Sequence, residues 1–428
     1  MSHYKPYPEY RPSEVEWIGG VPADWTVARI KRVATLRTDR CTDAPDGTQY
    51  IGLEDVESGT GQYRPTEGSS RQNEDSTVGV FKSGDVLYGK LRPYLKKAIV
   101  SEVNGVCSTE FLVLQPKTVL APWLHQWLLT TGVTQQIEAG CEGTKMPRAD
   151  WEHVGSIHVP SPAASEQAEI IAVLDHETKR IDSLIAKKTR FIELLKEKRQ
   201  ALITHAVTKG LDPNVKMRSS GDDWIKEIPV NWKSMKFGRI ARVTEGLVDP
   251  REEPYRSMVL IAPNHIESGT GRLIQLETAA EQNAESGKYQ CCAGNVVYSK
   301  IRPALAKVVI APCDGLCSAD MYPLDCTELV EPEWLFYLML STSFTAWAIL
   351  ESDRVAMPKI NRESLFELGV HVPPKDEQRR VVAFISASVL KSDALLSKTQ
   401  HSIDLLKERR SAFITAAVTG QIDLREVA

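Results

Sequence analysis

Two stretches of the chain carry apolar residues at helical spacing over more than forty positions. The first runs from Ser165, a predicted N-cap, to Gly210 without proline or glycine; the second runs from Asp376, also a predicted cap, to Gly420. In each, one apolar stripe recurs at coiled-coil spacing. Its members are Leu174, Ile181, Ile185, Ile192, Leu195 and Leu202, then Ile385, Leu396, Ile403, Leu406 and Phe413.

Each such helix would be roughly 65 Å long at 1.5 Å per residue. A helix of that length with a single apolar stripe needs a partner, and the other stretch is the nearest candidate. Parallel and antiparallel pairing are both possible from the pattern; antiparallel pairing would give a pseudo-two-fold molecule with a domain at each end. The charged segments Lys187-Lys188 and 196–199 are interpreted as solvated faces of the first helix.

The remaining segments, about 17–160 and 224–373, are rich in glycine, proline and short β-type runs. Examples are "DVLYGKL", "KAIVSEV" and "TEFLVLQP" in the first, and "NVVYSKI" and "AKVVIAP" in the second. Tryptophan-rich, helix-like pieces at 122–137 and 332–350 interrupt them. We therefore predict a mixed α+β domain in each segment.

The chain is one long unit written twice. "ESGTG" occurs at 57–61 and again at 267–271, a shift of 210 positions. At the same shift, the segment 84–110 matches the segment 294–320. "LLKEKRQALITHAVT" at 194–208 matches "LLKERRSAFITAAVT" at 405–419 in eleven of fifteen positions, at a shift of 211. The repeat predicts four parts: mixed domains at 1–160 and 211–373, and helical regions at 161–210 and 374–428.

Composition bounds the class of protein. Apolar residues make up 42% and charged residues 25% of the 428, no run is long enough to cross a bilayer, and the start of the chain has no signal-peptide pattern. We expect a cytoplasmic protein. The eight cysteines lack paired spacing, so we expect buried reduced thiols and no metal site. A net charge of −4 argues weakly against nucleic acid, so only local charge can support that partner.

"GDVLYGKLRP" at 84–93 has the G-x-x-x-x-G-K frame of a phosphate-binding P-loop. Leu91 stands where the magnesium-binding hydroxyl should be, and in the second copy Ser299 replaces the second glycine. An ATP site is therefore excluded. Both copies keep K-[LI]-R-P, and residues 82–97 hold five cations against one acid, Asp85. Such a local positive patch suits contacts to nucleic-acid phosphates.

Together these features resemble the specificity subunit of type I restriction-modification systems. Each half opens with W-I-x-x-[VI]-P-x-x-W at 17–25 or 224–232, and each mixed domain ends in M-P-[RK], at 146–148 or 357–359. "VPSPAASEQ" or "VPPKDEQ" follows, and each helical region ends in L-L-K-E-[KR]-R. The resemblance covers nearly the whole chain.

The resemblance implies that the mixed domains are target recognition domains, each reading one half of a bipartite, asymmetric DNA sequence. The paired helices would set the spacing and dock two modification (methyltransferase) subunits, with restriction subunits joining afterwards. N6-adenine methylation and ATP-driven cleavage would lie in these partners, which would hold S-adenosylmethionine, ATP and Mg; no cofactor is expected in this chain. The half-sites should differ, because the mixed domains diverge more than the helices do.

The candidate DNA-binding residues are the repeated cations of this positive patch and the cation that ends each M-P-[RK] motif. They are Lys90, Arg92, Lys97, Lys300, Arg302 and Lys307, with Arg148 and Lys359. The alternative for Arg92 and Arg302 is a buried structural role.

Two other classes of function stay open at this point. A stand-alone nuclease or methyltransferase would need motifs that the sequence lacks, since it has neither [DN]-P-P-[YF] nor G-x-G-x-x-G, and no Ser/His/Asp or Cys/His pattern stands out. A coiled-coil adaptor without a nucleic-acid role would leave the duplicated mixed domains with their local cationic patches unexplained. We therefore expect a non-catalytic subunit that recognises DNA.

Overall fold

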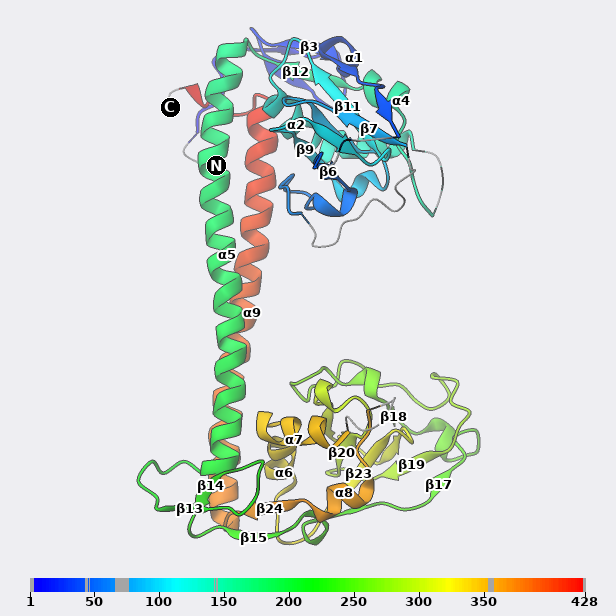
Figure 1. Cartoon of the computed structure of the whole chain (residues 1–428), viewed down its shortest axis with the longest axis vertical. Coiled ribbons are helices and arrows are strands. Elements are labelled where there is room, and N and C mark those ends of the chain that lie inside the picture. The colour runs from blue at the N-terminus through cyan, green and yellow to red at the C-terminus, as the bar shows by residue number, and fades with distance from the viewer. Residues whose placement is uncertain are drawn as a thin grey trace. The chain divides into compact units, whose positions relative to one another are not determined.

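The computed structural model describes residues 4–42, 45, 47–65, 77–141, 143, 145–352 and 358–425. The chain divides into two compact units: residues 1–188 with 401–428, and residues 189–400. Each unit holds one mixed α/β domain together with parts of two long helices, α5 (Ala164–Lys209) and α9 (Lys375–Val418) (Figure 1). The domain limits expected from the repeat stay predictions.

The mixed domain of the first unit is built from four small sheets and short helices. A hairpin pairs β1 (Tyr10–Pro12) with β2 (Gly20–Pro22), and β3 (Thr26–Arg29) pairs with β12 (His158–Ser161). The two four-stranded sheets have the orders β5-β7-β10-β6 and β4-β11-β8-β9. Their strands are β4 (Ala34–Leu36), β5 (Arg40–Cys41), β6 (Tyr50–Ile51), β7 (Val78–Phe81), β8 (Val86–Gly89), β9 (Ala98–Val100), β10 (Gly105–Cys107) and β11 (Phe111–Pro116); the helices are α1 (Ile30–Val33), α2 (Ala121–Leu128), α3 (Thr131–Ala139) and α4 (Trp151–Ser156).

The second unit repeats this plan. A hairpin joins β13 (Met217–Ser219) to β14 (Glu227–Pro229), and β15 (Lys233–Lys236) pairs with β24 (Gly369–Val372). Two four-stranded sheets are also present, as in the first unit. These sheets are β16-β23-β20-β21 and β17-β19-β22-β18. Their strands are β16 (Ala241–Val243), β17 (Leu247–Val248), β18 (Leu260–Ile261), β19 (Lys288–Cys291), β20 (Val296–Ser299), β21 (Val308–Ile310), β22 (Gly315–Cys317) and β23 (Met321–Cys326); the helices are α6 (Pro332–Leu340), α7 (Thr342–Ser352) and α8 (Arg362–Glu367).

The predicted strands are confirmed, and the predicted tryptophan-rich helices are each broken in two. The chain leaves helical geometry at Thr130 between α2 and α3, and at Ser341 between α6 and α7. At the second break the Ser341 hydroxyl accepts a hydrogen bond from the Phe344 amide at 3.2 Å, as an N-cap does. Apolar periodicity continues across both breaks, so it concealed them.

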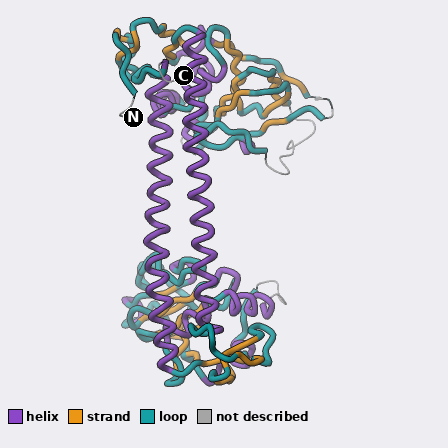
Figure 2. The backbone as a smooth tube through the Cα atoms, turned by 90° about the vertical axis from the view of Figure 1, so that its left-hand side faces the viewer, coloured by secondary structure: helices purple, strands orange, loops and turns teal. Residues whose placement is uncertain are grey.

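The two long helices are confirmed, but their predicted starts are wrong. α5 begins at Ala164 and α9 at Lys375, so Ser165 and Asp376 lie inside the first turn instead of capping it. The predicted ends are right: Gly210 and Gly420 have φ of 76° and 71°, the left-handed conformation that closes a helix. Figure 2 shows the two helices side by side.

The helices run antiparallel. In the first unit Arg410 Nε of α9 lies 2.9 Å from Asp182 Oδ1 of α5, and in the second Arg199 Nη1 of α5 lies 3.7 Å from Asp393 Oδ1 of α9. From Asp182 to Arg199 the chain advances seventeen residues along α5. Their partners, Arg410 and Asp393, lie seventeen residues apart along α9 in the reverse order. Arg199 corrects one expectation, because its side chain is 12% exposed and faces α9, whereas 196–198 are exposed as predicted.

Both long helices complete the core of each unit. In the first, Ile170 and Leu174 of α5 and Phe413 of α9 are buried with Trp123 and Trp127 of α2. In the second, Ile203 of α5 and Ile385 of α9 are buried with the side chains of α6. Each domain therefore rests on the N-terminal turns of one helix and the C-terminal turns of the other.

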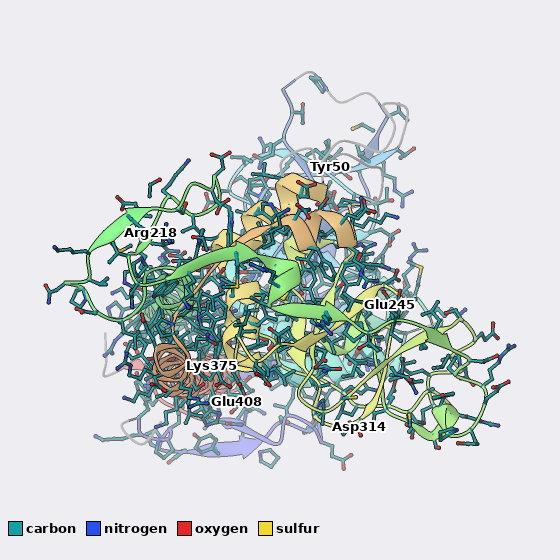
Figure 3. The ribbon with its side chains drawn as sticks, turned by 90° about the horizontal axis from the view of Figure 1, so that it is seen from below. Tyr50, Arg218, Glu245, Asp314, Lys375 and Glu408 are labelled. Atoms are coloured by element: carbon teal, nitrogen blue, oxygen red, sulfur yellow. The ribbon has the colours of Figure 1, made fainter. Side chains whose placement is uncertain are left out.

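The motifs at the helix starts form a polar clamp. Trp25 Nε1 donates to Glu166 Oε1 at 3.2 Å, and Trp232 Nε1 donates to Glu377 Oε1 at 3.0 Å. The next residue in each helix, Gln167 or Gln378, is buried and bonds to backbone groups of the domain. Figure 3 labels Lys375, where α9 begins. The repeated tryptophans and the E-Q pair thus fasten each domain to its helix.

Two expectations from composition can be compared with the structure. All eight cysteines are free thiols, but the expected burial holds for three of them only: Cys107, Cys291 and Cys317 are buried, Cys41, Cys141 and Cys326 are half-buried, and Cys292 and Cys313 are exposed. Among the described residues, no helix combines the length and the apolar character needed to span a bilayer.

Candidate nucleic-acid interface

The K-[LI]-R-P segment forms the same constrained turn in both units. Arg92 has φ of 51°, a 3₁₀ turn follows at Pro93–Leu95, and Lys96 has φ of 49°. Arg302 and Ala306 repeat this with φ of 48° and 42°. These are four of the six non-glycine residues with positive φ in the described chain. Each such residue costs of order 1–3 kcal/mol, so the surrounding structure must enforce the turn.

Backbone hydrogen bonds to two other segments hold the turn in each unit. Arg92 N donates to Pro147 O at 2.9 Å, and Gly59 N of the ESGTG loop donates to Lys96 O at 3.2 Å. In the second unit Arg302 N donates to Pro358 O at 2.9 Å, and Gly269 N to Leu305 O at 3.2 Å. The M-P-[RK] motif and the ESGTG loop are therefore repeated because both support this turn.

The second glycine of each ESGTG loop is required by close packing. Gly61 and Gly271 have φ of 67° and 73°, in the left-handed region that glycine adopts readily. A Cβ at Gly61 would collide with the His125 ring, and one at Gly271 would collide with the Phe336 ring. His125 Nε2 donates to Ala98 O at 3.0 Å, and its burial lowers its pKa to about 4.

The predicted cations fall into two groups. Arg92, Arg302 and Lys359 are exposed and Lys90 is half-buried, and none of these four side chains bonds to a described residue. The buried structural role considered for Arg92 and Arg302 is therefore wrong. Lys300 is half-buried with its ammonium 5.3 Å from the centre of the Tyr322 ring.

The other three cations are engaged within the protein. Lys97 Nζ donates to Leu53 O and Lys307 Nζ donates to Pro263 O, both at 2.6 Å. Arg148 forms a bidentate pair with Glu110, with Nη2–Oε1 at 2.7 Å and Nε–Oε2 at 3.1 Å. These contacts hold the edges of the turn and leave less of each charge available to a ligand. Met357 of the second M-P-[RK] motif lies outside the described residues.

The turn also presents a side chain that charge alone does not reveal. Tyr94 is 49% exposed between the two left-handed residues of the first turn, where the second copy has Ala304. Lys96 beside it donates to Thr131 Oγ1 at 2.9 Å, and burial lowers the pKa of this ammonium. An exposed tyrosine offers a face on which a base can stack.

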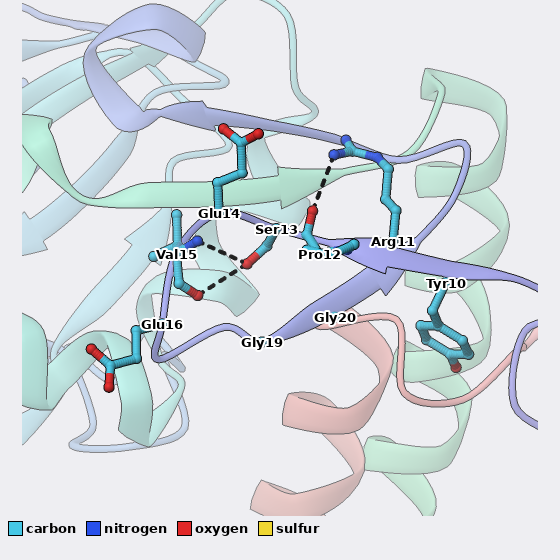
Figure 4. Close-up of a pocket in the computed structure, with 9 residues that line it drawn as sticks. All are labelled: Tyr10, Arg11, Pro12, Ser13, Glu14, Val15, Glu16, Gly19 and Gly20. Carbon is cyan, nitrogen blue, oxygen red and sulfur yellow. Dashed lines mark hydrogen bonds between the residues drawn. The ribbon is translucent and has the colours of Figure 1, made fainter.

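A hollow of about 510 Å³ lies at the β1–β2 hairpin (Figure 4). Its charged side chains are Arg11, Glu14 and Glu16. The Arg11 guanidinium donates to Ala23 O and Trp25 O, so its charge is committed to the backbone. The two carboxylates then leave the hollow unsuited to a polyanion.

The structure reveals one Ser/His/Asp series that the sequence concealed. Ser234 Oγ lies 3.0 Å from His371 Nδ1, and His371 Nε2 lies 3.0 Å from Asp222 Oδ2. Arg218 Nη2 also donates to Ser234 Oγ at 3.1 Å. These residues join the β13–β14 hairpin to β15 and β24, and His371 is only 2% exposed. The series braces the hairpin against the sheet. Among the described residues, no group of three His, Cys, Asp or Glu could hold a metal ion.

Comparison with known proteins bears on the whole chain. No family model matches it. The Type I restriction enzyme EcoDI specificity subunit of Escherichia coli is 27% identical over 420 residues, which cover 94% of this chain and 90% of the relative. The chain is therefore similar over nearly its whole length to a type I specificity subunit. The resemblance predicted from the motifs is confirmed, and neither a stand-alone enzyme nor a coiled-coil adaptor is supported.

Two solved structures have folds similar to that of this chain. A chain from a study of complex assembly and conformational transition of the type I R-M system has a TM-score of 0.72 at 18% identity, covering 93% of this chain and 98% of that one. The HsdS subunit from Thermoanaerobacter tengcongensis has a TM-score of 0.52 at 17% identity, covering 94% and 98%. The predicted fold, mixed domains alternating with two long paired helices, is thereby confirmed.

Proposed function

We propose that this chain is the DNA-recognition and assembly subunit of a type I restriction-modification complex. Each mixed domain reads one half of a bipartite target, and the paired helices set the spacing and dock the methyltransferase subunits. The observation that carries the proposal is homology to a specificity subunit over 94% of the chain. The duplicated architecture agrees with a target in two parts.

In each mixed domain we propose that the constrained turn contacts DNA. The exposed side chains of Arg92 and Arg302 bond to no described residue, and Lys90 and Lys300 stand just before the turn. Because its neighbours hold the turn in a strained conformation, the backbone that carries these cations needs no ordering on binding. Lys359 joins this set, whereas Arg148, Lys97 and Lys307 support it from within.

We propose that the helices dock two copies of the methyltransferase subunit. Leu184 and Leu194 of α5 are 41% and 46% exposed, and Leu395 and Leu405, at the equivalent positions of α9, are 46% and 50% exposed. Exposed leucines in repeated positions suit an apolar surface of a partner, and two equivalent sets suit two partners. Restriction subunits then join this assembly in the cytoplasm.

Catalysis belongs to the partners in this proposal. Methyl transfer to adenine N6 would use S-adenosylmethionine held by the methyltransferase subunits, and cleavage would use ATP and Mg held by the restriction subunits. This chain supplies position: it selects the DNA sequence and holds the catalytic subunits beside it.

A salt titration of the assembled complex on target and non-target duplexes tests the proposed turn. Lys90→Ala and Lys300→Ala should weaken binding to all duplexes alike and lower the log–log salt slope by about one unit for each lost phosphate contact. Lys97→Ala is the matched comparison, because its loss frees a carbonyl inside the fold and should lower the melting temperature. Unchanged affinity and salt slope in the first two variants would remove the turn from the interface.

Exchange of one domain tests the assignment of domains to half-sites. Replacing residues 17–160 by the matching domain of a homologue should change one half of the methylated sequence and preserve the other. Methylome sequencing of cells carrying the parent and the exchanged chain measures both halves at once. A change in both halves, or in neither, would contradict one domain per half-site.

A further inference from the structure

Two interhelical ion pairs are related by the internal repeat. Asp182 of α5 pairs with Arg410 of α9 in the first unit, and Asp393 of α9 pairs with Arg199 of α5 in the second. Asp182 and Asp393 occupy equivalent positions of the two copies, as do Arg199 and Arg410. Each helix therefore gives one aspartate and one arginine, and each pair joins an aspartate of one copy to an arginine of the other.

The arginines of these pairs are largely removed from water. Their side chains are 11% exposed for Arg410 and 12% for Arg199, and the partner carboxylates are 26% exposed for Asp182 and 52% for Asp393. Neither Nε makes an aligned hydrogen bond, so charge attraction is the main compensation for burying each guanidinium. A buried arginine deprived of its carboxylate is strongly unfavourable.

The stretch between the pairs has little apolar burial of its own. It comprises 183–198 of α5 and 394–409 of α9, all of which the structure describes, and Ile403 is its only fully buried apolar side chain. Ile185, Ile192 and Leu396 are half-buried. The helix ends differ, because there the domain cores hold both helices. The middle of the helix pair therefore depends more than its ends on the two ion pairs that flank it.

The same pairs lie next to the ESGTG loops. Gln62, which follows the first loop, donates through Nε2 to Asp182 Oδ2 at 3.4 Å. In the second loop, hydrogen bonds from Thr270 and then from Arg272 lower the pKa of Glu267, and the nearby charge of Arg199 adds to the shift. Since the first loop also bonds to its cationic turn, a connected path of contacts runs in the first unit from the proposed DNA contact to Asp182. In the second unit Arg199 acts on its loop through charge alone.

We propose that Asp182–Arg410 and Arg199–Asp393 are positioning residues that hold α5 and α9 together between the domains, and that they thereby restrict the spacer length at which both half-sites can bind. The first part stands on the structure of the helix pair, and the second rests on the proposed function. Polar residues buried between helices are known to specify how those helices pair. The residues act on spacing and leave base preference within each half-site unchanged.

The test uses Arg199→Met with Arg410→Met in the full complex, because methionine keeps much of the apolar stem and removes the charge. Binding is measured on duplexes whose spacer is that found in the methylome or differs from it by one or two base pairs. We expect discrimination between the correct and altered spacers to fall about tenfold, while single-base changes in either half-site cost as much as before. Hydrogen exchange in 183–198 and 394–409 should become several-fold faster.

Two further variants separate this role from general damage. Arg190→Met removes an exposed arginine that pairs with Glu193 of the same helix at 2.8 Å, and it should change neither measurement. The exchanged pair Asp182→Arg with Arg410→Asp should recover most of the spacer discrimination that Arg410→Met alone loses. Unchanged hydrogen exchange in the double methionine variant, or an equal effect of Arg190→Met, would overturn the positioning role.

The outcome also distinguishes this inference from the proposed function. If hydrogen exchange becomes faster but discrimination between spacers is unchanged, the ion pairs hold the helices together without restricting the spacer length. The second part of the proposal is then wrong. If the unmodified complex binds no specific duplex at all, the proposed function fails, whereas the hydrogen-exchange result still decides the first part.

Discussion

At the scale of single residues, repeated cations of the same type have different tasks. Lys90 and Lys97 belong to one predicted patch, but the Lys97 ammonium donates to Leu53 O at 2.6 Å while the Lys90 side chain bonds to no described residue. The sequence predicts how much charge a segment carries. It does not predict where each ammonium points, because that depends on carbonyls brought close by distant parts of the chain. The number of lysines and arginines exposed to solvent is therefore smaller than the number that the patch contains.

His125 makes the stability of the first unit depend on pH. Burial lowers its pKa from 6.5 to about 4, so the folded state keeps the ring neutral while the unfolded chain takes up a proton. This contribution to stability is fully present above pH 6.5 and is lost as pH falls toward 4. We expect a loss of about 2 kcal/mol between pH 7 and pH 5 from this residue.

The measurement compares wild type with His125→Phe by denaturant unfolding at pH 7 and pH 5. Phenylalanine is the matched choice because Phe336 covers Gly271 in the second unit as His125 covers Gly61 in the first. Burial also lowers the pKa of His371, so both proteins share that part of the pH dependence. An equal loss of stability in both proteins would mean that His125 is not the group responsible.

At the scale of elements, the spacing of apolar residues predicted helices and strands. It did not predict contacts between residues that are far apart in the sequence. The strands around Val86 and Val296 and the two long helices follow from spacing alone. Each long helix begins before its predicted cap, and in its first turn Glu166 or Glu377 bonds to Trp25 or Trp232 across more than 140 residues of sequence. Ser165 and Asp376 resemble N-caps in the sequence because these long-range contacts cannot be read from it.

Gln378 should be a large contributor to the stability of the second unit. It is fully buried in the first turn of α9, its Oε1 accepts from Glu331 N at 2.7 Å, and its Nε2 donates to Pro373 O at 2.9 Å. Gln378→Ala leaves both backbone groups without this partner, so we expect a loss of about 3 kcal/mol in unfolding free energy. Gln290→Ala, on the exposed face of β19, should change it by less than about 0.5 kcal/mol. Similar losses in the two variants, measured by denaturant unfolding, would show that the clamp contributes little.

At the scale of the whole molecule, the order of the chain differs from the order in which its parts pack. The repeat places residues 374–428 after the second mixed domain, yet residues 401–428 belong to the first compact unit. The sequence predicted that the two helices pair and left their direction open, because one apolar stripe suits either direction. Only antiparallel pairing returns the C-terminal turns of α9 to the first domain.

Substitutions at the two ends of α9 should therefore affect opposite domains. Phe413 is 4% exposed and its ring centre lies 5.3 Å from that of Tyr4, while Ile385 is fully buried in the core of the second unit. Phe413→Ala should cost about 3–5 kcal/mol and speed hydrogen exchange in 119–137 of the first domain, far from it in sequence. Ile385→Ala, the matched variant, should cost about 2–5 kcal/mol and act instead on 332–350. Faster exchange of 332–350 in the Phe413 variant, with 119–137 unchanged, would place the end of α9 with the wrong domain and refute the antiparallel arrangement.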